Sequence, residues 1–355
     1  MGSERILAFQ IKDKNLKNHV NLKYNNKNLM ENTIIKTRVV GVDVGIERTT
    51  FAIVGIRGNI IAADQIETLA YPDVNDYVSV LCEKITQLMI NNGGIETVRS
   101  IGVSAPSANF LTGCIENPPN LPWKGVVPLA AMMSDRLGLA VGLANDAHTT
   151  AHSELAFGSA HGMKDFITIT IGTGLGSCVF SGGREHQGAD GYAGEIGHTC
   201  IAEKGRLCGC GHEGCLEAYV AAKGIVQTAK DLMAKSDEPS LMRDIEKLSP
   251  RIITECCNKG DKMAIEVYRR TGKYLGMALA NYASIINPQA IIIAGGIAQA
   301  GQWLLKPACE AFEDHVFGCI KGKVKILAST IDNRIRDVLG ASAVAWEVKE
   351  YSLFK

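Results

Sequence analysis

The sequence predicts an α/β protein of two domains, and three observations support this prediction. Runs typical of strands alternate with amphipathic helical segments between residues 37 and 349, which is the pattern of α/β folds. The chain has 355 residues, more than one ordinary hydrophobic core usually organises. A similar pattern occurs twice, as VVGVDVGIERTTFAIVGI and as DFITITIGTGLGSCVFSGG. Each copy predicts a strand, a glycine turn and a second strand. This weak internal repeat predicts one hairpin in each half of the chain.

The first half begins with three predicted antiparallel strands. They are RVVGVDVG, TTFAIVGI and GNIIAADQIET, three runs separated by turn residues. Residues 73–91 carry apolar side chains at helical spacing, so we expect a helix there. RSIGVSAP then predicts a buried strand. Residues 107–125 are rich in Pro, Asn and Gly and predict a loop, and residues 126–137 predict a helix. LAVGLAND predicts a further strand that ends at polar residues.

The second half repeats the alternation. We expect a helix over residues 147–157, then the second hairpin, and mostly helix over residues 217–287. QAIIIAGGIA predicts a buried strand that ends in Gly-Gly, followed by a helix from about residue 301. KVKILAST predicts a strand, and residues 338–348 predict a closing helix.

The composition is that of a soluble globular protein. Lys and Arg together number 37 and so do Asp and Glu, and this balance does not favour a nucleic-acid or membrane-surface partner. No apolar run reaches the ~20 residues of a membrane span, and no secretory signal pattern opens the chain. We therefore expect a cytoplasmic location. Eleven scattered cysteines, an odd number, do not suggest a disulfide framework.

Residues 1–36 are rich in Asn and Lys and lack apolar periodicity. We interpret them as a disordered extension or one introduced by cloning, with Met30 as a candidate natural start. The alternative is a remnant of a DNA-binding domain. It is less favoured, because the segment is too short for a helix-turn-helix module with its supporting helices.

A glycine-rich segment, GYAGEIGHTCIAEKGRLCGCGHEGCLE, spans residues 191–217. Cys208, Cys210 and Cys215, with His198 upstream, offer three thiolates and one imidazole. This donor set predicts a closed tetrahedral site of the kind that holds structural zinc. The intervening glycines allow the tight turns that bring the sulfurs together. The alternative is three free thiols in a glycine loop.

Polar residues also end a predicted strand. In LANDAH, Asp146 is placed to accept a proton from a substrate hydroxyl, and Asn145 offers both a donor and an acceptor. The alternative is a plain turn with a helix N-cap. In GEIGH, Glu195 and His198 are three residues apart and can face one side. A metal on one ring nitrogen of His198 would orient the other nitrogen toward a ligand.

Three glycine turns follow predicted strands. Exposed N–H groups in GVDVG and IGTGLGS can hold phosphates, and Asp43 can hold magnesium through water. The turn in IIIAGGIA can admit an adenine or a ribose. Each turn alone is weak evidence, because most glycine hairpins are structural.

Together these motifs resemble the ROK family of bacterial sugar kinases and sugar-responsive repressors, over roughly residues 37–349. GHTCIAEKGRLCGCGHEGCLE resembles the zinc signature, LANDAH the catalytic motif, and PPNLPWKG and GYAGEIGH the sugar-binding segments. The resemblance implies an actin-like (ribonuclease H-like) duplicated fold with a ligand cleft between two domains, and a homodimer. The first domain would span residues 37–146, with the closing helix (about 338–349) packed back on it. The second would span residues 147–337 and carry the zinc loop.

The resemblance also implies ATP-dependent phosphorylation of a hexose at its 6-hydroxyl, with Asp146 as the general base. MgATP would bind on one side of the cleft and a hexose or N-acetylhexosamine on the other. The implied sugar contacts are Asn120, Asn145, Asp146, Glu195, His198 and Glu217. The implied nucleotide contacts are Asp43, Gly45, Gly172, Thr173, Gly174, Gly295 and Gly296.

The chain departs from the family in three places. The first phosphate hairpin of the family reads Asp-x-Gly-Gly-Thr, but here Ile46 and Glu47 replace the second glycine and the threonine. A carboxylate at that position would repel the γ-phosphate. Ser107 replaces the glycine of Ala-x-Pro-Gly, and His148 replaces an asparagine after the catalytic Asp-Ala.

These departures support a second hypothesis, a non-catalytic sugar sensor of the same family. A third hypothesis, a structural α/β protein with a zinc staple, explains only the cysteines. The kinase is favoured because the polar strand ends and the tandem hairpins occur together.

Overall fold

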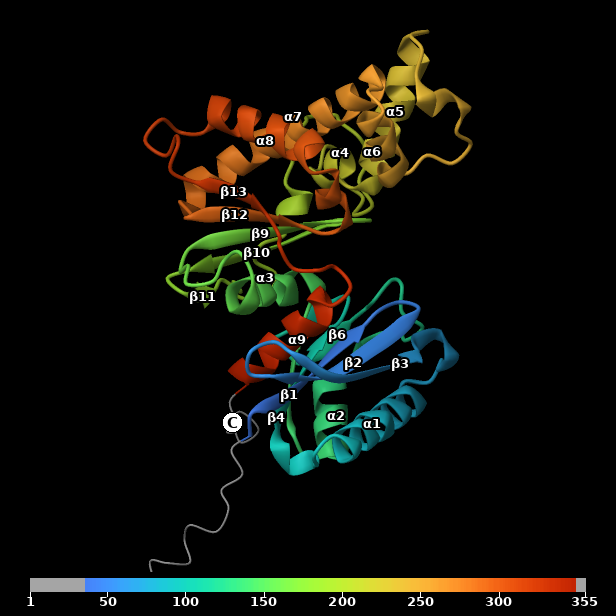
Figure 1. Ribbon diagram of the computed structural model, residues 1–355, viewed down its shortest axis with the longest axis vertical. Coiled ribbons are helices and arrows are strands. Elements are labelled where there is room, and N and C mark those ends of the chain that lie inside the picture. The colour runs from blue at the N-terminus through green and yellow to red at the C-terminus, as the bar shows by residue number, and fades with distance from the viewer. Residues whose placement is uncertain (1–35, 349–355) are drawn as a thin grey trace, which may run out of the picture. The chain divides into compact units, whose positions relative to one another are not determined.

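The computed structural model describes residues 36–348. The predicted extension, residues 1–36, lies outside the described residues except for Lys36, and so does residue 349 of the predicted closing helix. Figure 1 shows helices and strands arranged as two sheets with helices packed on them.

The first sheet has five strands in the order β3-β2-β1-β4-β8. They are β1 (Arg38–Val44), β2 (Arg48–Gly55), β3 (Ile60–Glu67), β4 (Val98–Ser104) and β8 (Ala140–Ala144). β2 pairs antiparallel with β1 and with β3, so the prediction of three antiparallel strands is confirmed. β4 is parallel to β1, and β8 is parallel to β4.

Two helices cover this sheet, α1 (Val74–Asn91) and α2 (Leu129–Leu137). Asp73 caps α1 because its carboxylate accepts from the N–H groups of Asn75 and Asp76. The buried face of α1, which includes Tyr77 and Leu81, packs on the strands. The helix predicted over residues 73–91 is therefore confirmed. Two short 3₁₀ turns, η1 (Thr68–Ala70) and η2 (Ile95–Thr97), connect these elements.

The loop predicted over residues 107–125 is wrong in part. The structure has a small antiparallel sheet of β5 (Ala108–Asn109), β6 (Cys114–Glu116) and β7 (Val126–Val127). Strands this short are too brief to show an alternating pattern in the sequence. The helix predicted from Val126 begins instead at Leu129, since Val126 and Val127 pair with β6.

The second sheet has the order β11-β10-β9-β12-β13. Its strands are β9 (Phe166–Ile171), β10 (Leu175–Ser181), β11 (Arg184–Glu185), β12 (Ala290–Ala294) and β13 (Lys325–Ala328). In both sheets the first three strands in sequence are antiparallel, and the last two run parallel to the first. The weak internal repeat in the sequence therefore corresponds to a duplicated sheet topology.

Most of the remaining chain is helical. These elements are α3 (Asp146–Phe157), η3 (Ile196–His198), α4 (Glu217–Val220), α5 (Ala222–Lys235), η4 (Leu241–Asp244), α6 (Pro250–Asn258), α7 (Lys262–Ile286), η5 (Gly296–Ala300), α8 (Gln302–His315) and α9 (Arg336–Glu347). Figure 1 shows α7 and α8 lying together over the second sheet, and they pack against each other. The predicted helical stretch over residues 217–287 is confirmed, although breaks divide it into several helices.

Helices α3 and α9 pack on each other. Helix α3 also packs against β9 and β10, and α9 packs against β1 and β4. Glycines permit this close approach. A Cβ on Gly102 would lie 1.9 Å from the carbonyl oxygen of Ala341, and one on Gly340 would lie 2.1 Å from that of Thr149. Because α3 begins at Asp146, this packing fixes the position of that residue.

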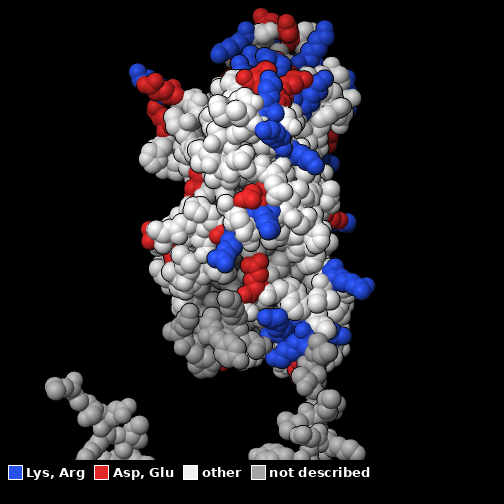
Figure 2. Space-filling view, turned by 90° about the vertical axis from the view of Figure 1, so that its left-hand side faces the viewer, with Lys and Arg blue, Asp and Glu red and all other residues white. Residues whose placement is uncertain are grey.

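The described surface carries both signs of charge. Figure 2 shows Lys and Arg among Asp and Glu on one face, with no continuous basic stripe on the part of the chain drawn in colour. Among residues 36–348, no helix is long and apolar enough to cross a bilayer.

Candidate functional site

A cavity of about 470 Å³ lies at the end of β8 and the start of α3. We call it the Asp146 cavity. Its polar lining residues are Ser107, Glu116, Asn145, Asp146, Thr170, Thr173, Ser177, Tyr192, Glu195 and Glu217. None of the residues that line it is Lys, Arg or His. The cavity therefore offers hydrogen-bond acceptors and donors, with net negative charge.

Asn145 and Asp146 end the strand and begin the helix. Asn145 caps α3, since its Oδ1 accepts from the N–H of His148 at 2.9 Å. Oδ1 of Asp146 accepts from the N–H of Ala147 at 2.9 Å. Burial raises the pKa of Asp146 and the nearby Asp337 raises it further, while hydrogen bonding and Arg336 oppose the change. The Asp146 side chain is exposed to solvent and lines the cavity, so a carboxylate with a raised pKa is accessible there to accept a proton.

Asp43 lies near the end of β1 in the same electrostatic environment. Burial, followed by the charges of Asp337 and Asp146, raises the pKa of Asp43 to about 7, against the opposing effect of Arg336. Hard divalent cations prefer carboxylate oxygens, and the magnesium contact of Asp43 stays a prediction. The Arg336 guanidinium pairs with Asp337, with Nε 2.9 Å from Oδ1.

The glycine turn after β9 forms one wall of the Asp146 cavity. Gly172, Thr173 and Gly174 line it, and the N–H of Gly172 donates to the carbonyl oxygen of Gly174 at 2.9 Å. Gly172 also lines a second cavity of about 500 Å³, which we call the Gly296 hollow. The two cavities therefore share one turn of backbone.

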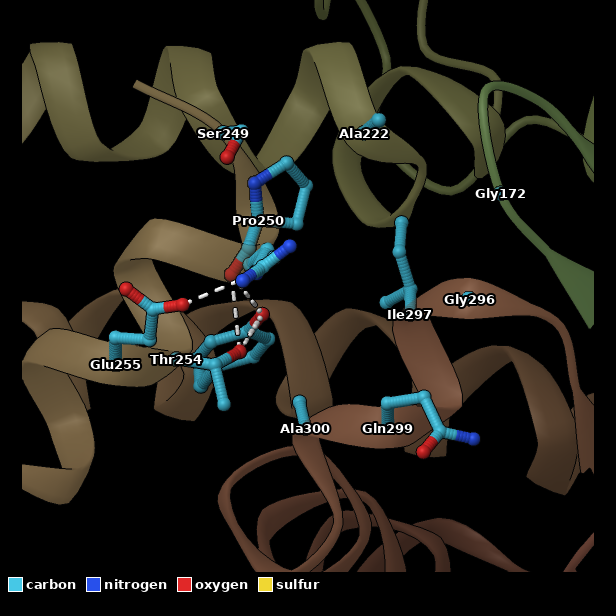
Figure 3. A pocket seen from close by; sticks show the side chains of 12 residues that line it. Gly172, Ala222, Ser249, Pro250, Thr254, Glu255, Gly296, Ile297, Gln299 and Ala300 are labelled. Atoms are coloured by element: carbon cyan, nitrogen blue, oxygen red, sulfur yellow. Dashed lines mark hydrogen bonds and ion pairs between the residues drawn. The ribbon is translucent and has the colours of Figure 1, made fainter. Parts of the chain in front are cut away.

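The Gly296 hollow lies between η5, α5 and α6. Figure 3 shows Gly172, Ala222 and Gly296 at one side, and Ser249 and Thr254 at the opposite side. Its apolar lining includes Pro250, Ile297 and Ala300. A hollow with apolar walls and a few polar groups is typical of small-molecule sites.

Two predicted nucleotide glycines have structural roles. Gly295 has φ +92° and a Cβ there would lie 2.3 Å from the carbonyl oxygen of Ile171, so packing requires glycine. The N–H of Gly45 donates to the carbonyl oxygen of Arg48 within the first hairpin. Asp43, Gly45 and Gly295 are not among the residues that line the Asp146 cavity or the Gly296 hollow. Their nucleotide contacts stay predictions.

The predicted metal ligands converge. Nδ1 of His198 lies 3.7 Å from Sγ of Cys208, and the Sγ atoms of Cys210 and Cys215 are 3.7 Å apart. All four ligand atoms lie within 4.8 Å of one another. This arrangement of three sulfurs and one nitrogen fits a tetrahedral zinc ion. Nε2 of His198 lies 3.9 Å from Oε2 of Glu195, a residue that lines the Asp146 cavity.

Glu217 connects the cysteine cluster to the glycine turn. It is the first residue of α4, and its Oε2 accepts from the N–H of Leu175 at 2.8 Å. Its Oε1 accepts from the thiol of Cys208 at 3.5 Å. The metal loop therefore contacts the cavity wall through Glu217 as well as through His198.

The structure brings four of the six predicted sugar contacts together. Asn145, Asp146, Glu195 and Glu217 line the Asp146 cavity, whereas His198 does not line it and lies beside Glu195, with Nε2 3.9 Å from Oε2. Asn120 is exposed and is not among the lining residues, so its sugar contact stays a prediction.

Sequence reasoning missed two lining residues that contact each other. The hydroxyl of Tyr192 donates to Oε2 of Glu116 at 2.5 Å, and that of Thr112 donates to Oε1 at 2.9 Å. Tyr192 lies inside the GYAGEIGH segment, and the resemblance of that segment to a sugar-binding motif could have identified the residue. Glu116 lies on β6, which has three residues and is too short to show a strand pattern in the sequence.

The model of the ROK family matches residues 39–348. The chain is 31% identical over 321 residues to a glucokinase of Halalkalibacterium halodurans, covering 88% of this chain and 94% of the relative. It is 26% identical over 309 residues to the xylose repressor of Bacillus subtilis, covering 86% of this chain and 76% of the repressor.

A ROK family glucokinase of Streptomyces griseus, solved with glucose and AMPPNP, has the same fold. It aligns with a TM-score of 0.72 and 28% identity, covering 88% of this chain and 100% of that chain. The actin-like two-domain fold that the resemblance implied is confirmed. Because the family model spans almost all of the described residues, this protein belongs to the ROK family.

Proposed function

We propose that this protein is a sugar kinase that transfers the γ-phosphate of ATP to the 6-hydroxyl of a hexose. The observation that carries the proposal is the placement of Asp146. Its exposed carboxylate, with a raised pKa, lines a polar cavity, and the glycine turn in the wall of that cavity also lines a second, largely apolar cavity. A base in one of two cavities that share a turn of backbone suits direct transfer between two bound substrates.

In the proposed reaction the sugar hydroxyl donates a hydrogen bond to Asp146. Asp146 takes the proton as the hydroxyl oxygen bonds to the γ-phosphorus. The bond from that phosphorus to the β–γ bridging oxygen breaks, and ADP leaves with the electron pair. In this proposal the backbone N–H groups of Thr173 and Gly174, in a turn that lines the cavity, hold phosphate oxygens, while that of Gly172 donates within the turn. Magnesium, when bound near Asp43, neutralises phosphate charge.

We propose a neutral hexose as the substrate, glucose first and N-acetylhexosamines next. Glu195, Glu217 and Asn145 line the cavity and can accept or donate hydrogen bonds to ring hydroxyls. No basic side chain lines it, which disfavours sugars that carry a carboxylate or phosphate. Glucokinases among the relatives also support this choice. The homodimer implied by the family stays a prediction.

The second candidate function is a sugar-responsive regulator that binds sugar without phosphorylating it. Ile46 and Glu47 at the tip of the first hairpin favour it, since Glu47 adds negative charge where the family holds phosphate. The similarity to the xylose repressor also supports it.

A coupled ADP-release assay tests the two candidates. We would measure turnover over a panel of hexoses and N-acetylhexosamines at saturating MgATP, and sugar binding by calorimetry in parallel. The kinase predicts sugar-dependent ADP release. Sugar binding without turnover on any member of the panel would support the regulator instead.

A further inference from the structure

A second group of metal-ligating side chains lies away from the cysteine loop. His148, Cys178 and Glu185 each offer one ligand atom, and these atoms lie within 4.8 Å of one another. They come from α3, β10 and β11. All three side chains are nearly or fully buried.

The geometry around Glu185 is organised by two histidines. Nδ1 of His148 contacts Oε1 of Glu185, and Nε2 of His152 lies 2.6 Å from Oε2. The two histidines are four residues apart on α3, which places both rings on one face of the helix. Nδ1 of His152 lies 3.2 Å from Oε1 of Glu347 at the end of α9.

The surroundings of Cys178 are apolar. Cys178 packs in a cluster with Phe166 and Phe180, whose rings stack 4.6 Å apart. The histidines and Glu185 can satisfy one another by hydrogen bonding, but that network does not involve the thiol. Among the described residues no hydrogen bond to Cys178 is formed, although its sulfur lies within reach of the other two ligands. The thiol of Cys178 is therefore the one side chain of this group that hydrogen bonding does not account for.

We propose that His148, Cys178 and Glu185 bind a borderline divalent transition-metal ion such as zinc. Sulfur, imidazole nitrogen and carboxylate oxygen are all zinc donors, and three protein ligands leave one position for water. The dication with one thiolate and one carboxylate is electrically neutral, which suits an apolar site. His152, held by Glu347, is a positioning residue that orients the second oxygen of Glu185.

The bound ion would join α3 to the β10–β11 edge of the second sheet. His148 lies two residues after Asp146, so the ion would stabilise the first turn of the helix that carries Asp146. This site does not depend on the proposed kinase activity, because a regulator with the same fold would have the same metal ligands.

Metal analysis of the full, tag-free chain tests the proposal directly. We expect two equivalents of zinc per wild-type chain, one in Cys178→Ala and one in Cys210→Ser. We expect none in the double variant. Cys82→Ala is the matched control, because Cys82 is a buried cysteine on α1 outside both groups, and it should retain two equivalents.

Two outcomes would overturn the proposal. One is a single equivalent in the wild type that disappears in Cys210→Ser. The other is an unchanged second equivalent in Cys178→Ala, which would place that ion elsewhere.

A spectroscopic test that leaves Cys178 intact can still contradict the proposal if Cys178→Ala does not fold. Cobalt(II) added to the metal-free Cys210→Ser chain should bind with one equivalent and give the visible bands of a tetrahedral site. Adding Glu185→Gln to Cys210→Ser should remove these bands. Bands that persist in that double variant, or their absence from Cys210→Ser itself, would contradict the site.

Discussion

Asp43, Asp146 and Asp337 share one electrostatic environment although they lie far apart in the sequence. Asp337 raises the pKa of both Asp43 and Asp146, and Asp146 also raises that of Asp43. The family pattern pointed to Asp43 and Asp146, whereas nothing local in the sequence pointed to Asp337. Its role arises from α9, which packs against β1 and β4.

The raised pKa of Asp43 predicts a pH dependence of stability. Its pKa rises from 3.8 to about 7 on folding, so the folded state holds a proton that the unfolded state has lost. This contribution to the free energy of unfolding is fully present below pH 3.8 and is lost as pH rises through about 7. Denaturant titrations of the magnesium-free protein between about pH 5 and 8 should show stability falling with pH, and Asp43→Asn should flatten the slope. Equal slopes in the two proteins would contradict the burial of Asp43.

Glu47 predicts a second measurable effect. Its side chain is exposed, and its carbonyl oxygen accepts from the N–H of Thr68, so a substitution leaves that backbone bond intact. If the hairpin tip lies near the γ-phosphate, Glu47→Thr should raise kcat/KM for ATP about tenfold by removing repulsion worth about 1.4 kcal/mol. Glu47→Gln separates the loss of charge from the gain of a hydroxyl. Unchanged ATP kinetics in both variants would place the tip away from the nucleotide.

Asn145 and Asp146 show what a local pattern can and cannot predict. The sequence presented a helix cap and a ligand site as alternatives, yet Asn145 both caps α3 and lines the cavity. Residue types and spacing therefore predicted the cap, while a ligand contact at these positions stays a prediction. Whether a side chain caps the helix, lines the cavity or does both depends on its orientation, and tertiary packing determines that orientation.

At the scale of elements, the cysteine loop connects metal binding to the cavity wall. Removing zinc should release His198 beside Glu195 and free Cys208, whose sulfur lies 3.5 Å from Oε1 of Glu217. We expect Cys210→Ser to lose zinc and to weaken sugar binding roughly 10- to 100-fold, measured by calorimetry. Cys200→Ser is the control, because Cys200 is exposed in the same loop and is not in the metal group. Undiminished sugar affinity after zinc loss would show that the loop does not support the cavity.

Helix α9 supports the other side of the site. In Gly102→Ala the new Cβ would lie 1.9 Å from the carbonyl oxygen of Ala341, so α9 must move away from β4. We expect a loss of at least about 1–3 kcal/mol in the free energy of unfolding, measured by denaturant titration. Gly318→Ala is the control, because a Cβ there meets nothing within 4 Å. Equal stability of the two variants would contradict the close packing of α9.

Long elements were predictable and short ones were not. The helix at residues 73–91 and the paired hairpins have repeating apolar patterns over many residues, and these patterns specify both type and approximate position. β5, β6 and β7 have two or three residues each, so pairing rather than sequence pattern defines them. Glu116 of the cavity was missed for the same reason.

At the scale of the whole molecule, duplication creates the site. The two sheets share one strand order, and the helices α3 and α9 packed between them connect the halves. The repeated hairpin motif predicted a hairpin in each half, and the resemblance to the family implied the full duplication. Sequence alone did not predict that Glu116 and Tyr192 from different halves would bond to each other, because such pairs depend on how the halves pack.

The most direct test of the account is transfer of labelled γ-phosphate from ATP to glucose by the wild type and by Asp146→Asn. Asparagine cannot accept the proton, so we predict sugar phosphorylation by the wild type and a loss of about 10²- to 10⁴-fold in kcat in the variant. Sugar affinity should be largely retained, and Asp135→Asn, at an exposed aspartate on α2, should behave as the wild type. Phosphorylation at wild-type rates by Asp146→Asn, or none by the wild type on any hexose, would contradict the account.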